Sequence, residues 1–352
     1  MSFGKGISDM TQTGTDRQPE APREGGGRLW KWTKRVLLGL VGLVIFVLIA
    51  GVIYQFVATK IDAYRWYPPP SEMVDVGGSS MHLYCTGEEG RAPTIVMDIG
   101  SGGIGMDWQR VQPGVAKFAR VCSYDRAGTG WSDQGPQPRT SQQIVKELHT
   151  LLGNAGVEGP YVLVGHSFGG VNMQLYASRY PDEVAGMVLV DSAIADKDFL
   201  RAMEPSFPSP VWLKFLATIG VTRLPYTLGG VTDERAAIST HAKDNYELAN
   251  YISSMGKSYE EVRAAPMSLE DKPLIVLSAG SRGKMFPQFS QKGSDRFNET
   301  WTESQADLTQ ASQNSKQIIA KESGHNIQYD DPGLVIDATS QVVEAARNGG
   351  SV

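Results

Sequence analysis

The residues best suited to catalysis form a turn in which a serine is flanked by two glycines, Gly165-His166-Ser167-Phe168-Gly169. Apolar residues 162–164 before it suit a buried strand, and residues 171–180 after it are typical of a helix. In a strand–turn–helix of this kind the serine is held on a strained turn with its hydroxyl exposed above a sheet. The N–H of Phe168, at the start of the helix, can then donate to a developing oxyanion. Ser167 is the candidate nucleophile, although a serine in an ordinary glycine-rich turn would look the same.

A serine nucleophile needs a histidine base, and the chain has 5 histidines. Four of them lie where they suit this role poorly: in an early strand, on a predicted helix, beside the serine, and in an irregular block (His82, His149, His166 and His241). His325 lies in a loop directly after the last predicted strand, 316–320. Because α/β folds gather their chemistry in loops at the carboxyl ends of strands, His325 is the predicted base.

A second oxyanion donor is expected in the glycine-rich loop 100–105, which follows a predicted strand at 93–99. We assign the N–H of Ser101 as the partner of the Phe168 N–H. The same loop also matches G-x-G-x-x-G, with Asp125 placed as a ribose ligand after the next strand. A dinucleotide-dependent oxidoreductase is therefore an alternative, but it leaves Ser167 and His325 unexplained.

An uncharged apolar run, Val36 to Val57, precedes all these candidates. As a helix it would reach about 33 Å, against a hydrocarbon core of about 30 Å. Residues 36–58 are therefore predicted to be a transmembrane helix. Four basic residues crowd its N-terminal flank, which by the positive-inside rule puts the N-terminus in the cytoplasm and the rest of the chain outside it. A cleaved signal peptide is the alternative, but its apolar run is usually shorter.

The remaining domain boundaries follow from composition. Residues 1–27 are polar and glycine-rich, and the whole segment 1–35 is expected to be disordered in the cytoplasm. Residues 59–71 are expected to form a juxtamembrane spacer. Residues 72–348 alternate predicted strands and helices, which indicates a mostly parallel sheet covered on both faces. An irregular block at 192–272 is predicted to be an inserted helical cap. The net charge of −5, with no basic run, argues against a nucleic-acid partner, and no Cys/His cluster has metal-ligand spacing.

Taken together, these residues resemble the α/β-hydrolase family from about Val74 to Ala346. The resemblance rests on the segment Tyr124–Ser132, the Ser167 turn, Val188-Leu189-Val190-Asp191 and Gly324-His325. It implies an eight-stranded, mostly parallel sheet with the second strand antiparallel and a helical cap between strands six and seven. It also implies a Ser/acid/His triad that uses no cofactor.

The triad acid is where the chain departs most from the family. Members commonly carry it just after strand seven, but residues 278–283 here contain no carboxylate. Some members take the acid from the end of strand six, where this chain has Asp191. Asp191 is therefore the predicted acid, with Asp295 and Asp307 as alternatives. Asp191 could instead be a turn or helix-capping residue.

The resemblance has a consequence for the 2 cysteines, Cys85 and Cys122. It implies that their strands lie side by side in the sheet. Outside the cytoplasm such cysteines could be bridged if their Cα atoms lie within about 7 Å of each other. Two buried free thiols are the alternative.

The predicted function is hydrolysis of a carboxylic ester, small or lipid-like, through an acyl-enzyme on Ser167. A serine at this turn excludes relatives whose chemistry needs an aspartate there. Apolar cap residues suggest a hydrophobic acyl or alcohol group (Phe207, Trp212, Phe215 and Leu216). A non-catalytic binding protein of the same fold is the other alternative.

Overall fold

A computed structural model describes residues 25–61, 69–88, 90, 93–194, 209–228, 234–239, 241–281 and 291–352. The predictions for residues 1–24, most of the spacer (62–68) and the first part of the cap (195–208, with Phe207) lie outside the described residues. The chain divides into two units, residues 1–49 and 50–352, each described by itself.

One long helix, α1 (Gly25–Ile61), contains the apolar run and is long and apolar enough to cross a membrane. It begins eleven residues before the predicted span, so the expectation of disorder is wrong for Gly25–Arg35. These residues include good helix formers, and the Lys34 ammonium lies 4.9 Å from the Trp30 ring centroid one turn away. The helix also extends over residues 59–61 of the predicted spacer.

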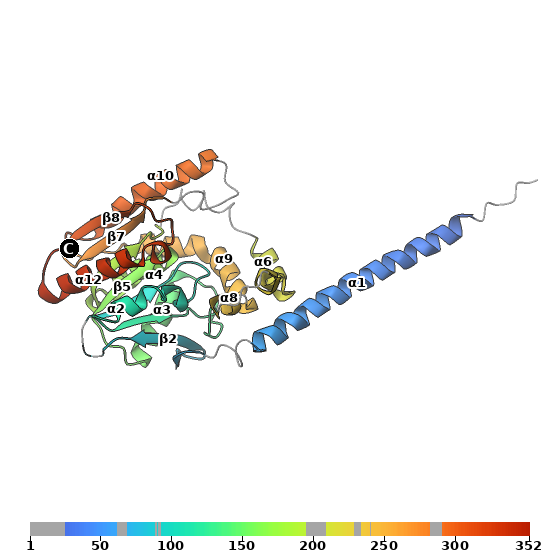
Figure 1. Cartoon of the computed structure of the whole chain (residues 1–352), viewed down its shortest axis with the longest axis horizontal. Helices are drawn as coiled ribbons and strands as arrows, with labels where there is room; N and C mark the ends of the chain where they lie inside the picture. The colour runs from blue at the N-terminus through green and yellow to red at the C-terminus, as the bar shows by residue number, and fades with distance from the viewer. Residues whose placement is uncertain are drawn as a thin grey trace, which may run out of the picture. The chain divides into compact units, whose positions relative to one another are not determined.

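The globular unit is organised around one eight-stranded sheet (Figure 1). Its strands are β1 (Glu72–Asp75), β2 (Ser80–Thr86), β3 (Thr94–Asp98), β4 (Val121–Tyr124), β5 (Tyr161–His166), β6 (Val184–Val190), β7 (Leu274–Ala279) and β8 (Ser315–Ala320). Their order is β1-β2-β4-β3-β5-β6-β7-β8, and β2 is antiparallel to both of its neighbours while all other pairs are parallel. The predicted sheet, including its antiparallel second strand, is confirmed.

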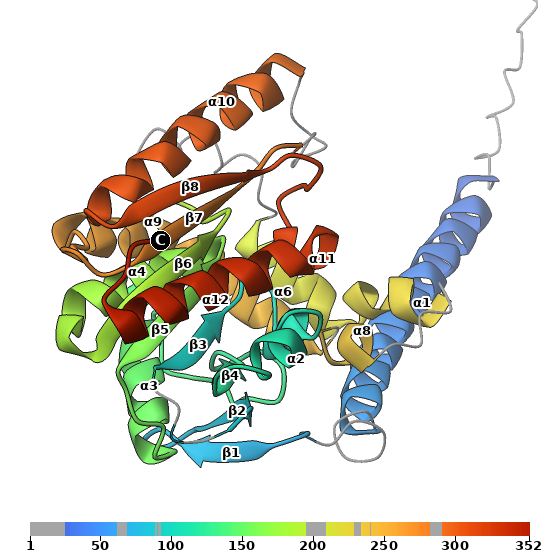
Figure 2. The same ribbon diagram turned by 60° about the vertical axis from the view of Figure 1, so that its left-hand side comes forward.

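Helices cover both faces of the sheet (Figure 2). One layer contains α3 (Ser141–Asn154), α4 (Phe168–Arg179), α9 (Ala242–Ala264) and α10 (Gln291–Leu308). The other contains the 3-10 turn η2 (Gly105–Trp108), α2 (Gln112–Val115), α11 (Ile327–Asp330) and α12 (Pro332–Asn348). Each face of the sheet has its own hydrophobic core, and successive strand residues point into different cores. On β5, Leu163 packs in the first core, and Val162 and Val164 pack in the second. This two-sided burial is what makes β5 continuously apolar.

The cap prediction agrees with the described residues between β6 and β7. They form α6 (Pro210–Thr218), the 3-10 turn η5 (Val221–Arg223), α7 (Leu224–Leu228), α8 (Glu234–Ser239) and α9. Between β3 and β4 the chain forms η2 and the single turn of α2 rather than one continuous helix. Pro113 stands at the start of α2 and lacks the N–H needed to continue a helix from η2.

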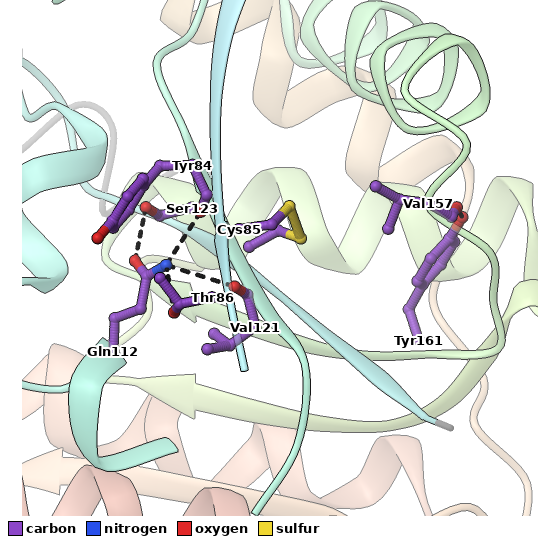
Figure 3. Close-up of a disulfide and its surroundings, with 9 residues drawn as sticks. Tyr84, Cys85, Thr86, Gln112, Val121, Ser123, Val157 and Tyr161 are labelled. Atoms are coloured by element: carbon purple, nitrogen blue, oxygen red, sulfur yellow. Dashed lines mark hydrogen bonds between the residues drawn. A yellow bond between two sulfur atoms is a disulfide. The ribbon is translucent and has the colours of Figure 1, made fainter. Parts of the chain in front are cut away.

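A disulfide joins Cys85 and Cys122, which face each other directly across β2 and β4 with Cα atoms 4.1 Å apart (Figure 3). On the opposite face of the sheet, the Gln112 side chain links the same two strands by hydrogen bonds. Its Nε2 donates to the carbonyl oxygens of Tyr84 and Val121, and its Oε1 accepts from the Ser123 hydroxyl. Of the two alternatives for these cysteines, the structure has the disulfide, and the two strands are linked on both faces.

Candidate active site

Ser167 occupies a strained turn between β5 and α4. Its φ of 52° and ψ of −121° lie in a region that residues with a side chain rarely adopt. The turn is packed too tightly for larger neighbours: a Cβ at Gly169 would lie 2.3 Å from the Asp98 carbonyl oxygen, and one at Gly165 would lie 2.5 Å from the Gly170 Cα. These contacts explain why the serine is flanked by glycines and fix its hydroxyl at the carboxyl end of the sheet.

The structure brings Asp191 and His325 together. Asp191 follows β6 and is fully buried, and its Oδ2 lies 2.7 Å from the His325 Nδ1. Its other oxygen accepts the Ala279 N–H at 3.0 Å, at the end of β7. Since a carboxylate only accepts, the His325 Nδ1 carries the proton and the ring's lone pair is on Nε2. This is the tautomer that a general base needs.

The two alternative acids lie elsewhere, on α10. Asp295 is exposed and accepts a hydrogen bond from Gln291, and Asp307 is exposed near the end of the helix. Of the three candidate acids, all within the described residues, Asp191 is the one that contacts His325. The catalytic roles of Ser167, His325 and Asp191 remain predictions.

His166 supports the His325 loop, a contact that the sequence did not predict. Its Nε2 donates to the His325 carbonyl oxygen at 3.0 Å, and the Gln328 amide donates to its Nδ1 at 3.4 Å. Burial, and next the nearby His325, lower the pKa of His166 to about 3. His166 is therefore neutral at physiological pH, the form that lets one ring nitrogen donate and the other accept.

Burial of neutral His166 predicts a pH dependence of stability. Between about pH 3 and 6.5 the unfolded chain binds a proton at this position and the folded chain does not, so the free energy of unfolding rises with pH over this window. We expect the slope to fall by up to about 1.4 kcal/mol per pH unit in His166→Gln. Urea unfolding in detergent at pH 4, 5, 6 and 7 measures it, and equal slopes in the two proteins would contradict the prediction.

The loop after β3 passes directly over the serine turn. A Cβ at Gly100 would lie 3.1 Å from the Ser167 Cβ, so Ser101, the next residue, lies near the nucleophile. Helix α9 covers this loop from the cap side: a Cβ at Gly102 would meet the Leu248 side chain at 3.7 Å. The Tyr251 ring packs on the Phe168 ring with centroids 4.0 Å apart. Leu248 and Tyr251 of α9 therefore cover the loop that carries Ser101 and the side chain of Phe168.

The interpretation of Asp125 as a ribose ligand is wrong. Asp125 is fully buried, its Oδ1 accepts the Gly105 N–H, and its Oδ2 accepts the Trp131 N–H and lies 3.1 Å from the His82 Nδ1. A ribose cannot reach a carboxylate that is enclosed in this way. The order of the strands also differs from the 3-2-1-4-5-6 order of a dinucleotide-binding sheet.

The two remaining histidines, His149 and His241, have contacts typical of a structural role. His149 lies 3.0 Å from Glu183 and stacks on Tyr180 with ring centroids 4.0 Å apart. His241 is buried at the N-terminus of α9. Within the described parts of the chain, no three His, Cys, Asp or Glu side chains are grouped so as to hold a metal ion.

The comparisons with known proteins agree with this architecture. Residues 93–224 match the family model described as the alpha/beta hydrolase fold. The chain is 29% identical over 243 residues to the uncharacterized protein YqjL of Bacillus subtilis, which covers 69% of this chain and 80% of that protein. It is also 29% identical over 247 residues to an uncharacterized Schizosaccharomyces pombe protein. This match covers 66% of this chain and 43% of that protein.

A solved structure of a probable hydrolytic enzyme from Pseudomonas aeruginosa has the same fold. The TM-score is 0.60 at 18% sequence identity, over 78% of this chain and 95% of that one. The chain thus has the α/β-hydrolase fold. Residues 93–224, which match the family model, include β3 to β6 and the Ser167 turn.

Proposed function

We propose that the chain is a serine hydrolase that cleaves carboxylic esters through an acyl-enzyme on Ser167. The observation that carries the proposal is the 2.7 Å contact between the His325 Nδ1 and Asp191, formed beside a serine on a strained turn. A histidine oriented by a buried carboxylate near a half-buried serine hydroxyl is an arrangement that can make the serine a nucleophile.

In this mechanism the His325 Nε2 takes the Ser167 proton as Oγ attacks the ester carbonyl. The N–H groups of Ser101 and Phe168 donate to the oxyanion of the tetrahedral intermediate. The imidazolium, paired with Asp191, then protonates the leaving alcohol. Water, activated by the same histidine, releases the acyl group and restores the serine.

The described walls of the site favour an uncharged, hydrophobic substrate. Leu248 and Tyr251 cover the loop and the serine turn, and the Trp301 ring meets the His325 ring edge to face with centroids 5.3 Å apart. Apolar walls exclude water from the acyl-enzyme and bind acyl or alkyl groups better than charged ones. An ester is favoured over an amide because an alkoxide leaves more readily than an amine.

We also propose that α1 anchors the enzyme in a membrane, with residues 72–348 on the extracytoplasmic side. Basic residues in the first turns of α1 support this orientation, and the Cys85–Cys122 disulfide suits an oxidising compartment. A protease added to intact cells should degrade the globular domain. Degradation only after the membrane is permeabilised would contradict the orientation.

The proposed nucleophile is tested by labelling the purified chain in detergent with a fluorophosphonate and assaying p-nitrophenyl esters of increasing acyl length. We expect wild type to be labelled and active, and Ser167→Ala to lose both properties. Ser253→Ala, which removes an exposed hydroxyl on α9, is the matched control and should behave as wild type. A folded wild type that neither labels nor turns over would instead favour the non-catalytic binding protein.

A further inference from the structure

Arg126 is a buried arginine, from the loop after β4, whose guanidinium lies against the oxyanion loop. Its Nη1 donates to the Ile99 carbonyl oxygen at 2.5 Å, and its Nη2 donates to the Gly100 carbonyl oxygen at 2.6 Å. Nη1 also lies 2.6 Å from the Asp98 carboxylate. One side chain thus binds three successive residues at the end of β3.

The contact with Gly100 fixes the direction of the predicted donor at Ser101. The Gly100 carbonyl and the Ser101 N–H belong to the same planar trans peptide and point in opposite directions. Because Arg126 holds the carbonyl, the N–H must point away from the guanidinium. Nearby Gly102 and Gly103 have wide conformational freedom, so the local sequence does little to restrain this peptide by itself.

Arg126 is also linked to the second predicted donor. Its Cζ lies 5.9 Å from the centroid of the Phe168 ring, within the range of a cation–π contact. The Asp98 carboxylate that pairs with Arg126 accepts a hydrogen bond from Asn172 on α4 at 2.8 Å. Phe168 is the first residue of α4, so the same network reaches the helix that supplies this N–H.

We propose that Arg126 is the positioning residue of the oxyanion hole. It orients the Ser101 N–H so that this group and the Phe168 N–H point at the same oxyanion. The inference rests on the proposed acyl transfer at Ser167. Arg126 itself does not touch the substrate; it acts through the peptide plane that it orients. Loss of one oxyanion donor costs roughly 10²–10³-fold in kcat, which sets the size of the expected effect.

The test compares Arg126→Met with Arg139→Met. Arg139 is also a buried arginine, but it pairs with Glu147 and Glu247 and donates to the carbonyl oxygens of Pro136 and Ala127 instead of to residues 99–103. In the full chain in detergent, kcat and KM are measured on a p-nitrophenyl ester, and amide hydrogen exchange is followed over residues 98–104. We expect Arg126→Met to lower kcat roughly 10²–10³-fold with KM within about threefold, and to speed exchange in the loop.

Arg126→Lys should recover part of kcat, because an ammonium can still donate to one of the carbonyl groups. Arg139→Met should keep kcat and loop exchange near wild type even where it lowers stability. A folded Arg126→Met with wild-type kcat and exchange would overturn the proposal, as would an equal loss of kcat in Arg139→Met. If wild type shows no ester turnover, the proposed function fails, and exchange alone then decides whether Arg126 orders the loop.

Discussion

Replacing Asp191 with asparagine should lower kcat by about 10⁴-fold while the protein stays folded. The amide oxygen can still accept the Ala279 N–H, but the amide nitrogen then donates to the His325 Nδ1. This forces the other tautomer, with the proton on Nε2, so the ring cannot accept the Ser167 proton. Asparagine also tolerates the positive φ of 39° at this position better than most residues.

The matched controls are Asp295→Asn and Asp307→Asn, which remove the same charge from exposed positions on α10. Both should retain wild-type kcat on the same p-nitrophenyl ester, and circular dichroism should report the same fold for all three variants. Loss of turnover in Asp307→Asn or Asp295→Asn with normal turnover in Asp191→Asn would show that the acid has been assigned incorrectly.

Removing the disulfide should lower the free energy of unfolding by about 4 kcal/mol. The Cys85–Cys122 bridge closes a loop of 37 residues, and the chain-entropy estimate for such a loop at 25 °C gives this value. The effect is measured by urea unfolding of wild type with and without reductant, and of the Cys85→Ala/Cys122→Ala double variant. The reduced wild type and the double variant should unfold at similar, lower urea concentrations.

Val96→Ala is the control for lost packing. Val96 is fully buried on β3 and pairs in register with Cys122, so its truncation removes core volume without removing a covalent link. This variant should be destabilised and should lose further stability when reductant is added. A wild type whose urea midpoint does not change on reduction would contradict the stabilising role of the bridge.

Much of the fold and the serine turn could be predicted because their signals are local. The apolar strand before Ser167, the glycines around it and the loop position of His325 are each visible within a few residues. Predicting Asp191 as the acid needed one more observation, namely that no carboxylate follows the seventh predicted strand. The same local reasoning misjudged the start of α1, because a polar composition does not show that residues 25–35 continue the helix of the apolar run.

The contacts that orient the site could not be predicted in the same way because they join distant segments. Arg126 follows β4 and binds the end of β3, and these strands are neighbours only in the folded sheet. The hydrogen bond from His166 to the His325 carbonyl spans 159 residues of sequence. An arginine after a strand, or a histidine beside a serine, carries no local sign of these partners.

The Ala279 N–H that holds Asp191 has a consequence for how hydrolase-like chains are sorted into active and degenerate members. The end of β7, where the resemblance to the family leads one to expect the acid, provides a backbone N–H here, and the carboxylate that contacts His325 comes from the end of the neighbouring strand β6. A survey that looks for an acid at a fixed alignment column would class this chain with the pseudoenzymes. The more informative criterion is whether any buried carboxylate reaches the histidine, whichever strand supplies it.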